Sequence, residues 1–320
     1  MYSQKKLIVS HAPFIHEGSR VPNRNYHIIL AALPAVLMGF YHFGLPAVGV
    51  VALSVSSAML WELLANVLRK KEKHTIGDGN AAIIGLLFAM LLPATIPWWF
   101  IIVGTFFAVM VGQQAFGGIG HNPFNPVVFA ALVLFVSYRN YFDFNVALVN
   151  YDFEFAAIYP LTALKTYGVS GVEGFSTMDL LMGNQTGGIG ATFGLGIILG
   201  GIYLIIRGFI RWEISLSFLA GIFITAAIFN FANPDQYAGP MFHLVTGYTL
   251  LGAFFLATED SSSPVNFNSM LIYGAVGGFM TILIRNIGAY ADGVLFAIVL
   301  INLLAPIFEK IRPKALGKVD

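Results

Sequence analysis

The stretch "NPVVFAALV" (Asn125–Val133) returns 167 residues later as "DGVLFAIVL" (Asp292–Leu300), with a valine, a phenylalanine and an alanine in step. The same offset brings the short apolar segment 79–93 onto a second short apolar segment, 244–258. Both short segments contain glycine and end at a proline or at an acidic, serine-rich break. Matching interrupted segments of this kind are typical of half-helices that line a central site in membrane proteins with an internal repeat.

The composition agrees with a membrane protein. Hydrophobic residues make up 57% of the 320 residues, charged residues only 10%, and the mean hydropathy is +0.77, whereas a soluble domain carries roughly a quarter charged residues. Several apolar runs are long enough to cross roughly 30 Å of hydrocarbon. They cover residues 26–43, 45–68, 96–113, 121–137, 192–208, 212–231, 268–285 and 288–309.

With the two short segments, each repeat contains five spans, and an odd number forces the second repeat to enter the membrane inverted. We therefore predict an all-α polytopic membrane protein, with about ten transmembrane helices in an inverted 5+5 repeat with short half-helices. The predicted parts are a cytoplasmic N-terminal segment (1–25), a first five-helix repeat (26–137), an extracytoplasmic loop (138–189), a second, inverted five-helix repeat (190–309) and a cytoplasmic tail (310–320).

The lysines and arginines orient these spans, because basic loops favour the cytoplasm. With both termini inside, 14 basic residues fall on the cytoplasmic side, and three, Arg139, Lys165 and Arg285, fall outside. Thr192, at the entry of the sixth span, is then expected on the extracytoplasmic side. The N-terminus shows no signal-peptide pattern, so the first span is expected to direct insertion.

The composition also disfavours several kinds of function. A net charge of +1 offers no basic face for nucleic acid. The chain has no cysteine, which removes disulfides and cysteine-held zinc or iron–sulfur clusters. The seven histidines show no HxxxH or HExxH spacing, so no metal or haem site is expected. Any redox cofactor is therefore expected to be held in another way.

Two Asn-Pro pairs interrupt the approach to the fifth predicted span, in "FGGIGHNPFNPVVF" (Phe116–Phe129). One interpretation is a tight turn in which Asn122 and Asn125 cap the following helix, with Pro126 in its first turn. The other is a ligand site, because a carboxamide both donates and accepts hydrogen bonds and can hold the edge of a planar ligand. The residues alone leave both roles open, and both can hold together.

Three long motifs carry a resemblance to a known family: "GGIGHNPFNP", "FHLVTGYTLLGAFFLATEDSSSP" and "IRNIGAYADGVLFAIVLINLLAPIFEKIRP". Together they resemble the D subunits of Rnf electron-transport complexes and the related B subunit of the sodium-pumping NADH:quinone oxidoreductase. The resemblance runs from about residue 10 to the C-terminus. The chain lacks the long extensions of the quinone-reductase subunit, so it looks more like the Rnf version.

The resemblance implies an FMN joined through its phosphate to a threonine hydroxyl, in a short motif of small residues. "IGAT" supplies that motif here, with Thr192 as the acceptor. Its neighbours Gly188, Gly190 and Ala191 leave room for the ribityl phosphate and for a modifying enzyme, and a helix N-terminus favours phosphate. By position alone, Thr192 is instead expected to be a plain helix cap. Phe193 stands where a small hydroxyl residue is more familiar in this family.

The family also holds a second flavin, a noncovalent riboflavin, and we assign it to the Asn-Pro loop with Asn122 and Asn125. The counterpart in the second repeat, "ATEDSSSP", departs from the more usual Ala-Thr-Asp-Pro and makes Thr258, Glu259 and Asp260 weaker candidates. The alternative for these three is a solvated cytoplasmic turn.

Two carboxylates lie within or beside predicted spans. Asp292 falls near the outer end of the last span, and a partner such as Arg285 would make it structural rather than part of an ion pathway. Glu62, near the cytoplasmic end of the second span, is open to the same two interpretations.

The predicted function is a membrane subunit of an Rnf-type ferredoxin:NAD oxidoreductase complex, with electron transfer coupled to Na⁺ or H⁺ translocation. The implied partners are a second flavinylated subunit, an iron–sulfur/NADH subunit, a flavin transferase and membrane lipid. The implied location is a bacterial or archaeal cytoplasmic membrane. The alternative is a small-solute channel or transporter of the urea or ammonium type, since an inverted repeat with half-helices is also a transport architecture. A scaffold for other subunits is a third interpretation.

Overall fold

A computed structural model describes residues 21–70, 77–151, 153, 155 and 157–311. Most of the predicted N-terminal segment and nearly all of the predicted tail lie outside these residues. Helices and turns account for the regular structure in the described part, which contains no strand. The expectation of an all-helical membrane protein is confirmed.

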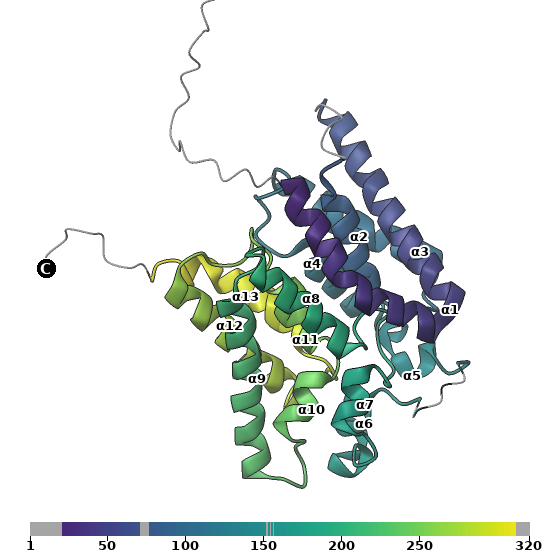
Figure 1. Ribbon diagram of the computed structural model, residues 1–320, viewed down its shortest axis with the longest axis vertical. Coiled ribbons are helices and arrows are strands. Elements are labelled where there is room, and N and C mark those ends of the chain that lie inside the picture. The colour runs from purple at the N-terminus through teal and green to yellow at the C-terminus, as the bar shows by residue number, and fades with distance from the viewer. Residues whose placement is uncertain (1–20, 71–76, 152, 154, 156, 312–320) are drawn as a thin grey trace, which may run out of the picture.

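The first long helix, α1 (Val21–Leu68), is two helices joined at a kink (Figure 1). Gly44 takes φ 66° and ψ −151° there, a conformation that side-chain-bearing residues rarely adopt. The first half runs toward the kink and the second half runs back beside it in the figure. The break falls between the predicted spans 26–43 and 45–68, so this boundary is confirmed.

Within the described residues, four stretches of helix are long and apolar enough to cross a membrane. They are α1, the run Trp98–Phe116, α9 (Trp212–Ala232) and α12 (Phe267–Asn286). The Trp98–Phe116 run is made of α3 (Trp98–Phe106), a π-helical turn η2 (Phe107–Val111) and a 3-10 turn η3 (Gln114–Phe116). A π-helical turn inside a helix frequently marks a functional site.

The other apolar helices are short: α2 (Asn80–Leu91), α4 (Pro126–Ser137), α8 (Gly194–Ile206) and α13 (Val294–Phe308). The prediction of full-length helices over 121–137, 192–208 and 288–309 is therefore wrong in length. Each of these helices begins late because an extended or glycine-rich loop occupies the start of the apolar run. At 1.5 Å per residue such helices span roughly 20 Å, so they resemble half-helices more than full spans.

The predicted segment 244–258 is broken rather than continuous. It consists of the end of α10 (Pro240–Val245), a turn, α11 (Thr249–Leu251) and a π-helical turn η6 (Gly252–Leu256). Gly247, with φ 65°, allows the turn between α10 and α11. The helices keep the order that the 167-residue offset predicts, whereas ten crossings in an inverted 5+5 arrangement stay a prediction.

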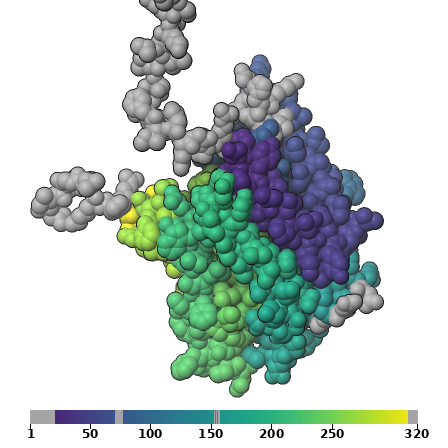
Figure 2. Space-filling view, viewed as in Figure 1, coloured from purple at the N-terminus to yellow at the C-terminus, as the bar shows by residue number. Residues whose placement is uncertain are grey.

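The segment 138–189 folds into short helices: η4 (Arg139–Phe142), α5 (Phe144–Ala147), α6 (Pro160–Tyr167), η5 (Val169–Gly171) and α7 (Thr177–Met182). In Figure 1 these lie at the end of the molecule away from the start of α1 and the end of α13. Figure 2 shows the first half of the chain, in purple and blue, packed against the green second half, with the teal segment at the lower end.

Small residues bring the helices of the second half close together. A Cβ on Gly278 would overlap the carbonyl oxygen of Phe218, and one on Gly221 would lie 2.5 Å from that of Ala275. These contacts join α9 to α12 without room for a side chain. Close backbone approach of this kind is a common way to pack helices in membranes, where apolar burial alone drives little association.

Candidate functional site

Thr192 lies in the loop that precedes α8, and this loop is docked on the end of α2. The Ile189 amide donates to the Leu92 carbonyl at 3.0 Å, and the Gly190 amide donates to the Met90 carbonyl at 3.1 Å. Both carbonyls are at the C-terminal end of α2, where helix carbonyls lack partners within the helix. The docking therefore satisfies backbone groups on both sides and fixes the position of Thr192.

Glycine is required where this loop meets α2. A Cβ on Gly188 would lie 2.5 Å from the Met90 carbonyl oxygen, and one on Gly190 would overlap the Met90 side chain. On the other side of the loop, a Cβ on Gly39 of α1 would overlap the Ile189 carbonyl oxygen. The small residues of the motif thus have a packing role, whatever else they do.

The expectation that Thr192 is a plain helix cap is wrong. Helix α8 begins at Gly194, and its N-cap position is Phe193, which makes no side-chain cap bond. Thr192 is 2% exposed, and its hydroxyl has no hydrogen-bond partner. A buried polar atom without a partner costs about 1–3 kcal/mol, so it calls for an explanation.

Three more buried polar atoms without partners surround the space beside Thr192. They are the Tyr159 hydroxyl, the Thr186 hydroxyl and Oε1 of Gln185. The lining also includes Ala191 and three glycines, Gly187, Gly188 and Gly247. The unfilled space is about 180 Å³ and is too narrow for a water molecule. Hydroxyls that lack partners can donate hydrogen bonds to a phosphate, and the neighbouring glycines have no side chains that would block it. The lining residues would have to move apart to admit the phosphate.

A buried ion pair holds the adjacent turn between α10 and α11. Arg285 donates to Oδ1 of Asp292 at 3.0 Å, and it also donates to the His243 and Thr246 carbonyls at the end of α10. Oδ2 of Asp292 accepts from the Tyr248 amide at 2.8 Å. The expectation that Arg285 pairs with Asp292 is confirmed, and the structural role of the pair stays a prediction.

We expect Asp292→Asn to destabilise the protein by about 3–5 kcal/mol, because Arg285 would be left as an uncompensated buried charge. Asparagine can still accept a hydrogen bond from the Tyr248 amide, so the lost stability comes mainly from the ion pair. The measurement is thermal unfolding of the purified protein in detergent. Asp235→Asn, which removes an exposed carboxylate, is the matched control. Equal unfolding temperatures for the two variants would contradict a structural role for the pair.

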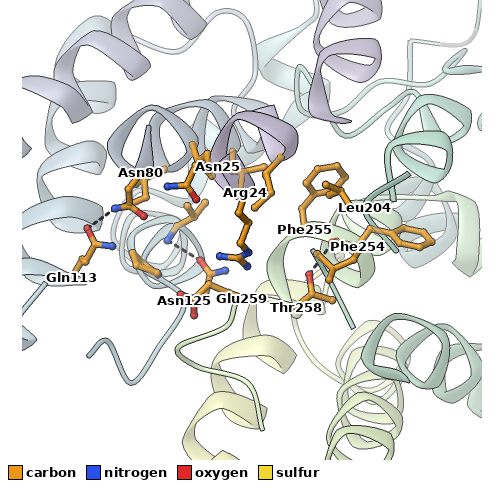
Figure 3. Close-up of a pocket in the computed structure, with 17 residues that line it drawn as sticks. Arg24, Asn25, Asn80, Gln113, Asn125, Leu204, Phe254, Phe255, Thr258 and Glu259 are labelled. Carbon is orange, nitrogen blue, oxygen red and sulfur yellow. Dashed lines mark hydrogen bonds between the residues drawn. The ribbon is translucent and has the colours of Figure 1, made fainter. Parts of the chain in front are cut away.

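A second site, which we name the inner cavity, lies between the two halves of the chain (Figure 3). It has about 600 Å³ of unfilled space, part of it open to solvent. Figure 3 shows the carboxamides of Asn80 and Gln113 on one side and the rings of Phe254 and Phe255 on the other. The polar lining is Arg24, Asn25, Asn80, Gln113, Asn125, Thr258 and Glu259. Apolar walls with a few convergent polar groups are typical of small-molecule sites.

Asn125 has the cap role and also joins the two halves. Its Oδ1 accepts from the Val127 and Val128 amides at 2.9 and 3.2 Å, and its Nδ2 donates to the Leu256 carbonyl at 2.9 Å. It lines the inner cavity as well. The cap prediction is confirmed for Asn125, and the two proposed roles are compatible.

Asn122 does not cap α4, so the cap prediction is wrong for this residue. Its Nδ2 donates to the Phe124 carbonyl at 3.0 Å and to Oε1 of Glu259 at 3.2 Å. Its Oδ1 is buried without a partner. Asn122 is not among the residues that line the inner cavity, although its partner Glu259 is. Asn122 could therefore contact a ligand in the inner cavity only at the edge of the cavity, next to Glu259.

The three weaker candidates occupy different positions. Thr258 lines the inner cavity, and its hydroxyl donates to the Phe254 carbonyl at 2.8 Å. Glu259 also lines the cavity. Asp260 lies outside it and pairs with Arg24 at 2.9 Å. The turn is thus part of the cavity wall through Thr258 and Glu259 rather than wholly a solvated turn.

Sequence reasoning missed Asn25, Asn80 and Gln113 as site residues. Asn25 donates to the Asp78 carbonyl at 2.9 Å, and Asn80 donates to Oε1 of Gln113 at 2.9 Å. Each of these residues lies at the end of an apolar run. This position is the one sequence signal that could have identified them as candidate site residues. Nothing in their spacing shows that they face one cavity, because they come from three separate helices.

Glu62 lies in the second half of α1 and is 2% exposed. Its Oε2 has no hydrogen-bond partner. It does not line the inner cavity. The structural and the ion-pathway interpretations of Glu62 are both untested by these contacts.

Comparison with known proteins shows that this chain is similar to subunits of ion-translocating oxidoreductase complexes. The model of the "NQR2, RnfD, RnfE family" matches residues 8–317. A protein of Colwellia psychrerythraea, named as the D subunit of an ion-translocating oxidoreductase complex, is 33% identical, with 97% of each chain covered. Proteins of the same name from Cronobacter sakazakii and Escherichia coli O127:H6 are each 31% identical. Each of these two alignments covers 97% of this chain and 98% of the relative.

Proposed function

Because the chain belongs to the NQR2, RnfD, RnfE family of ion-translocating oxidoreductase complex subunits, we propose that it carries covalent FMN on Thr192 and a noncovalent riboflavin in the inner cavity. Electrons would pass between these flavins within an Rnf-type ferredoxin:NAD oxidoreductase complex, coupled to Na⁺ or H⁺ translocation. The observation that carries the proposal is the buried Thr192 hydroxyl without a hydrogen-bond partner.

The attachment of FMN needs a nucleophilic hydroxyl, an activated flavin nucleotide and a flavin transferase. Thr192 Oγ1 forms the new bond to phosphorus and loses its proton, while the bond from phosphorus to the leaving group of the nucleotide breaks. Because Thr192 is 2% exposed, the docked loop must open for the transferase to reach it. The bound flavin supplies the redox chemistry, and the chain supplies position, burial and hydrogen bonds.

The inner cavity supports the riboflavin assignment through its chemistry. An isoalloxazine ring has apolar faces and a polar edge, and the cavity places phenyl rings opposite a group of carboxamides. The aromatic rings can stack on the ring faces, and the carboxamides can both donate to and accept from the polar edge. Hydrogen bonds to that edge are one way in which a protein tunes a flavin.

The proposed partners are the other membrane and peripheral subunits of the complex, including a second flavinylated subunit and an iron–sulfur/NADH subunit. The relatives are named as subunits of a complex, which supports this. The proposed location is a bacterial or archaeal cytoplasmic membrane, with both termini inside and Thr192 outside. The relatives do not support the alternative of a solute channel or transporter, since their names describe oxidoreductase subunits.

The test of this proposal is in-gel fluorescence. The wild-type chain, produced in cells that possess a flavin transferase, is purified, denatured and run on a gel under ultraviolet light. We expect a fluorescent band at the position of the chain. A flavin held by a phosphoester stays on the denatured chain, whereas a noncovalent flavin is released. A dark band from such cells would contradict the proposed function.

A further inference from the structure

A basic pocket, which we name the arginine pocket, lies between the start of α1, the turn from α8 to α9 and the segment before α12. It has about 1820 Å³ of unfilled space, part of it open to solvent. Its charged lining residues are Arg24, Arg207, Arg211 and Asp260. Three arginines against one aspartate give the lining a charge of +2, with His27 counted as neutral. A basic pocket between membrane helices suits the phosphate of an anionic lipid.

The turn from α8 to α9 is fixed against α1. Gly208, with φ 71°, reverses the chain after α8. Nε of Arg24 donates to the Phe209 carbonyl at 3.4 Å, and the His27 ring stacks on the Phe209 ring with 4.8 Å between their centres. The two arginines of the turn therefore extend from a backbone that is held in place.

The positive charges of Arg207 and Arg211 are not neutralised by a contact with a carboxylate. Both residues are exposed, and neither forms an ion pair within the residues that the structure describes. Arg207 has one side-chain hydrogen bond there, to Nε2 of His27 at 3.5 Å, which is at the long limit for such a bond. Arg24, by contrast, is paired with Asp260. Two arginines on one turn can both donate hydrogen bonds to a phosphate.

An exposed apolar surface adjoins the arginine pocket. Helices α1 and α8 pack closely, because a Cβ on Gly200 would overlap the Ala31 carbonyl oxygen, and Figure 2 shows the two helices side by side, in purple and green. Each helix exposes large apolar side chains at intervals of three or four residues, which is the spacing of one helix face. These are Leu30, Leu33 and Leu37 of α1 and Leu199, Ile202 and Ile206 of α8. Ile206 directly precedes Arg207, so the apolar surface of α8 reaches the pocket.

We propose that this surface binds an anionic phospholipid, with the lipid phosphate between Arg207 and Arg211 and the acyl chains along the exposed apolar residues of α1 and α8. A soluble phosphate or an acidic protein segment would match the arginines alone, whereas a lipid matches both the charge and the apolar surface. Trp212, which follows Arg211, is 45% exposed, and tryptophan is enriched where a membrane meets water. The proposal does not depend on either flavin.

The test is native mass spectrometry of the full chain, purified in detergent and titrated with lipid. Palmitoyl-oleoyl phosphatidylglycerol is compared with phosphatidylcholine that carries the same acyl chains. We expect phosphatidylglycerol to bind about thirtyfold more tightly, because each arginine near an anionic headgroup contributes roughly fivefold in affinity. The double variant Arg207→Gln/Arg211→Gln is expected to lose this preference and to bind both lipids equally.

Lys70→Gln/Lys310→Gln is the matched control, since it removes two positive charges from exposed residues that do not line the arginine pocket. It should keep the wild-type preference, and a control that loses the preference overturns the assignment to this pocket. Glycerol 3-phosphate at the lipid concentration should displace no lipid, because it has no acyl chains. Displacement would assign the pocket to a soluble phosphate and overturn the proposal.

Equal binding of the two lipids to the wild-type chain also overturns the proposal. So does a folded Arg207→Gln/Arg211→Gln chain that keeps the preference for phosphatidylglycerol. If this variant does not fold, the comparison of the two lipids on the wild-type chain decides.

Discussion

Thr192→Ala is expected to reduce the fluorescence of the denatured gel band to background. A phosphoester requires a hydroxyl, and alanine offers none. The folded chain should not suffer, because the Thr192 hydroxyl makes no hydrogen bond that the substitution would remove. Removing a buried hydroxyl without a partner is neutral or stabilising in the unmodified protein. The measurement is gel fluorescence at equal protein load, with thermal unfolding as a check on folding.

Two further substitutions separate attachment from packing. Thr192→Ser keeps a hydroxyl at the same position and is expected to keep a fluorescent band. Thr177→Ala removes an exposed hydroxyl on α7 that does not line this space, and it should leave the band unchanged. A fluorescent Thr192→Ala band would show that flavin is attached elsewhere. A dark Thr177→Ala band would show that the fluorescence depends on more than the hydroxyl at position 192.

The sequence predicts local breaks in this fold better than helix lengths. Gly44 marks the kink in α1, because a positive φ there favours glycine, and the predicted spans 26–43 and 45–68 end and begin on either side of it. The late starts of α4, α8 and α13 could not be predicted in the same way. The predicted spans include residues of the loops before these helices, and the structure shows that those residues are not helical.

The two candidate sites differ in how far the sequence reveals them. The "IGAT" motif identifies Thr192 through resemblance, yet the absence of a cap bond is a geometric fact that no pattern shows. The inner cavity depends on contacts between distant segments. Asn125 reaches the Leu256 carbonyl across 131 residues of sequence. Such contacts follow from how the two halves pack. The Asn-Pro motif singles out Asn125, whereas no motif singles out Gln113.

Gln113→Leu is expected to weaken riboflavin retention by about tenfold or more. Gln113 is 4% exposed, lines the inner cavity and accepts from Nδ2 of Asn80 through its Oε1. Leucine of similar size removes the carboxamide and leaves Asn80 without this partner. A lost hydrogen bond to a ligand, together with an unpaired buried donor, costs about 1–3 kcal/mol, which corresponds to roughly a five- to 150-fold loss of affinity. Acid precipitation of the purified protein, followed by chromatography of the released flavin, measures retention.

Gln114→Leu provides the matched control for this substitution. Gln114 is the next residue and is buried to a similar degree, but its Oε1 accepts from Arg69 and it does not line the inner cavity. It should keep wild-type riboflavin content. Gln113→Leu should also keep its fluorescent gel band, whereas Thr192→Ala should lose the band and keep its released riboflavin. Because the two flavins are assigned to separate spaces with no shared lining residue, loss of both flavins in either variant would contradict two independent sites.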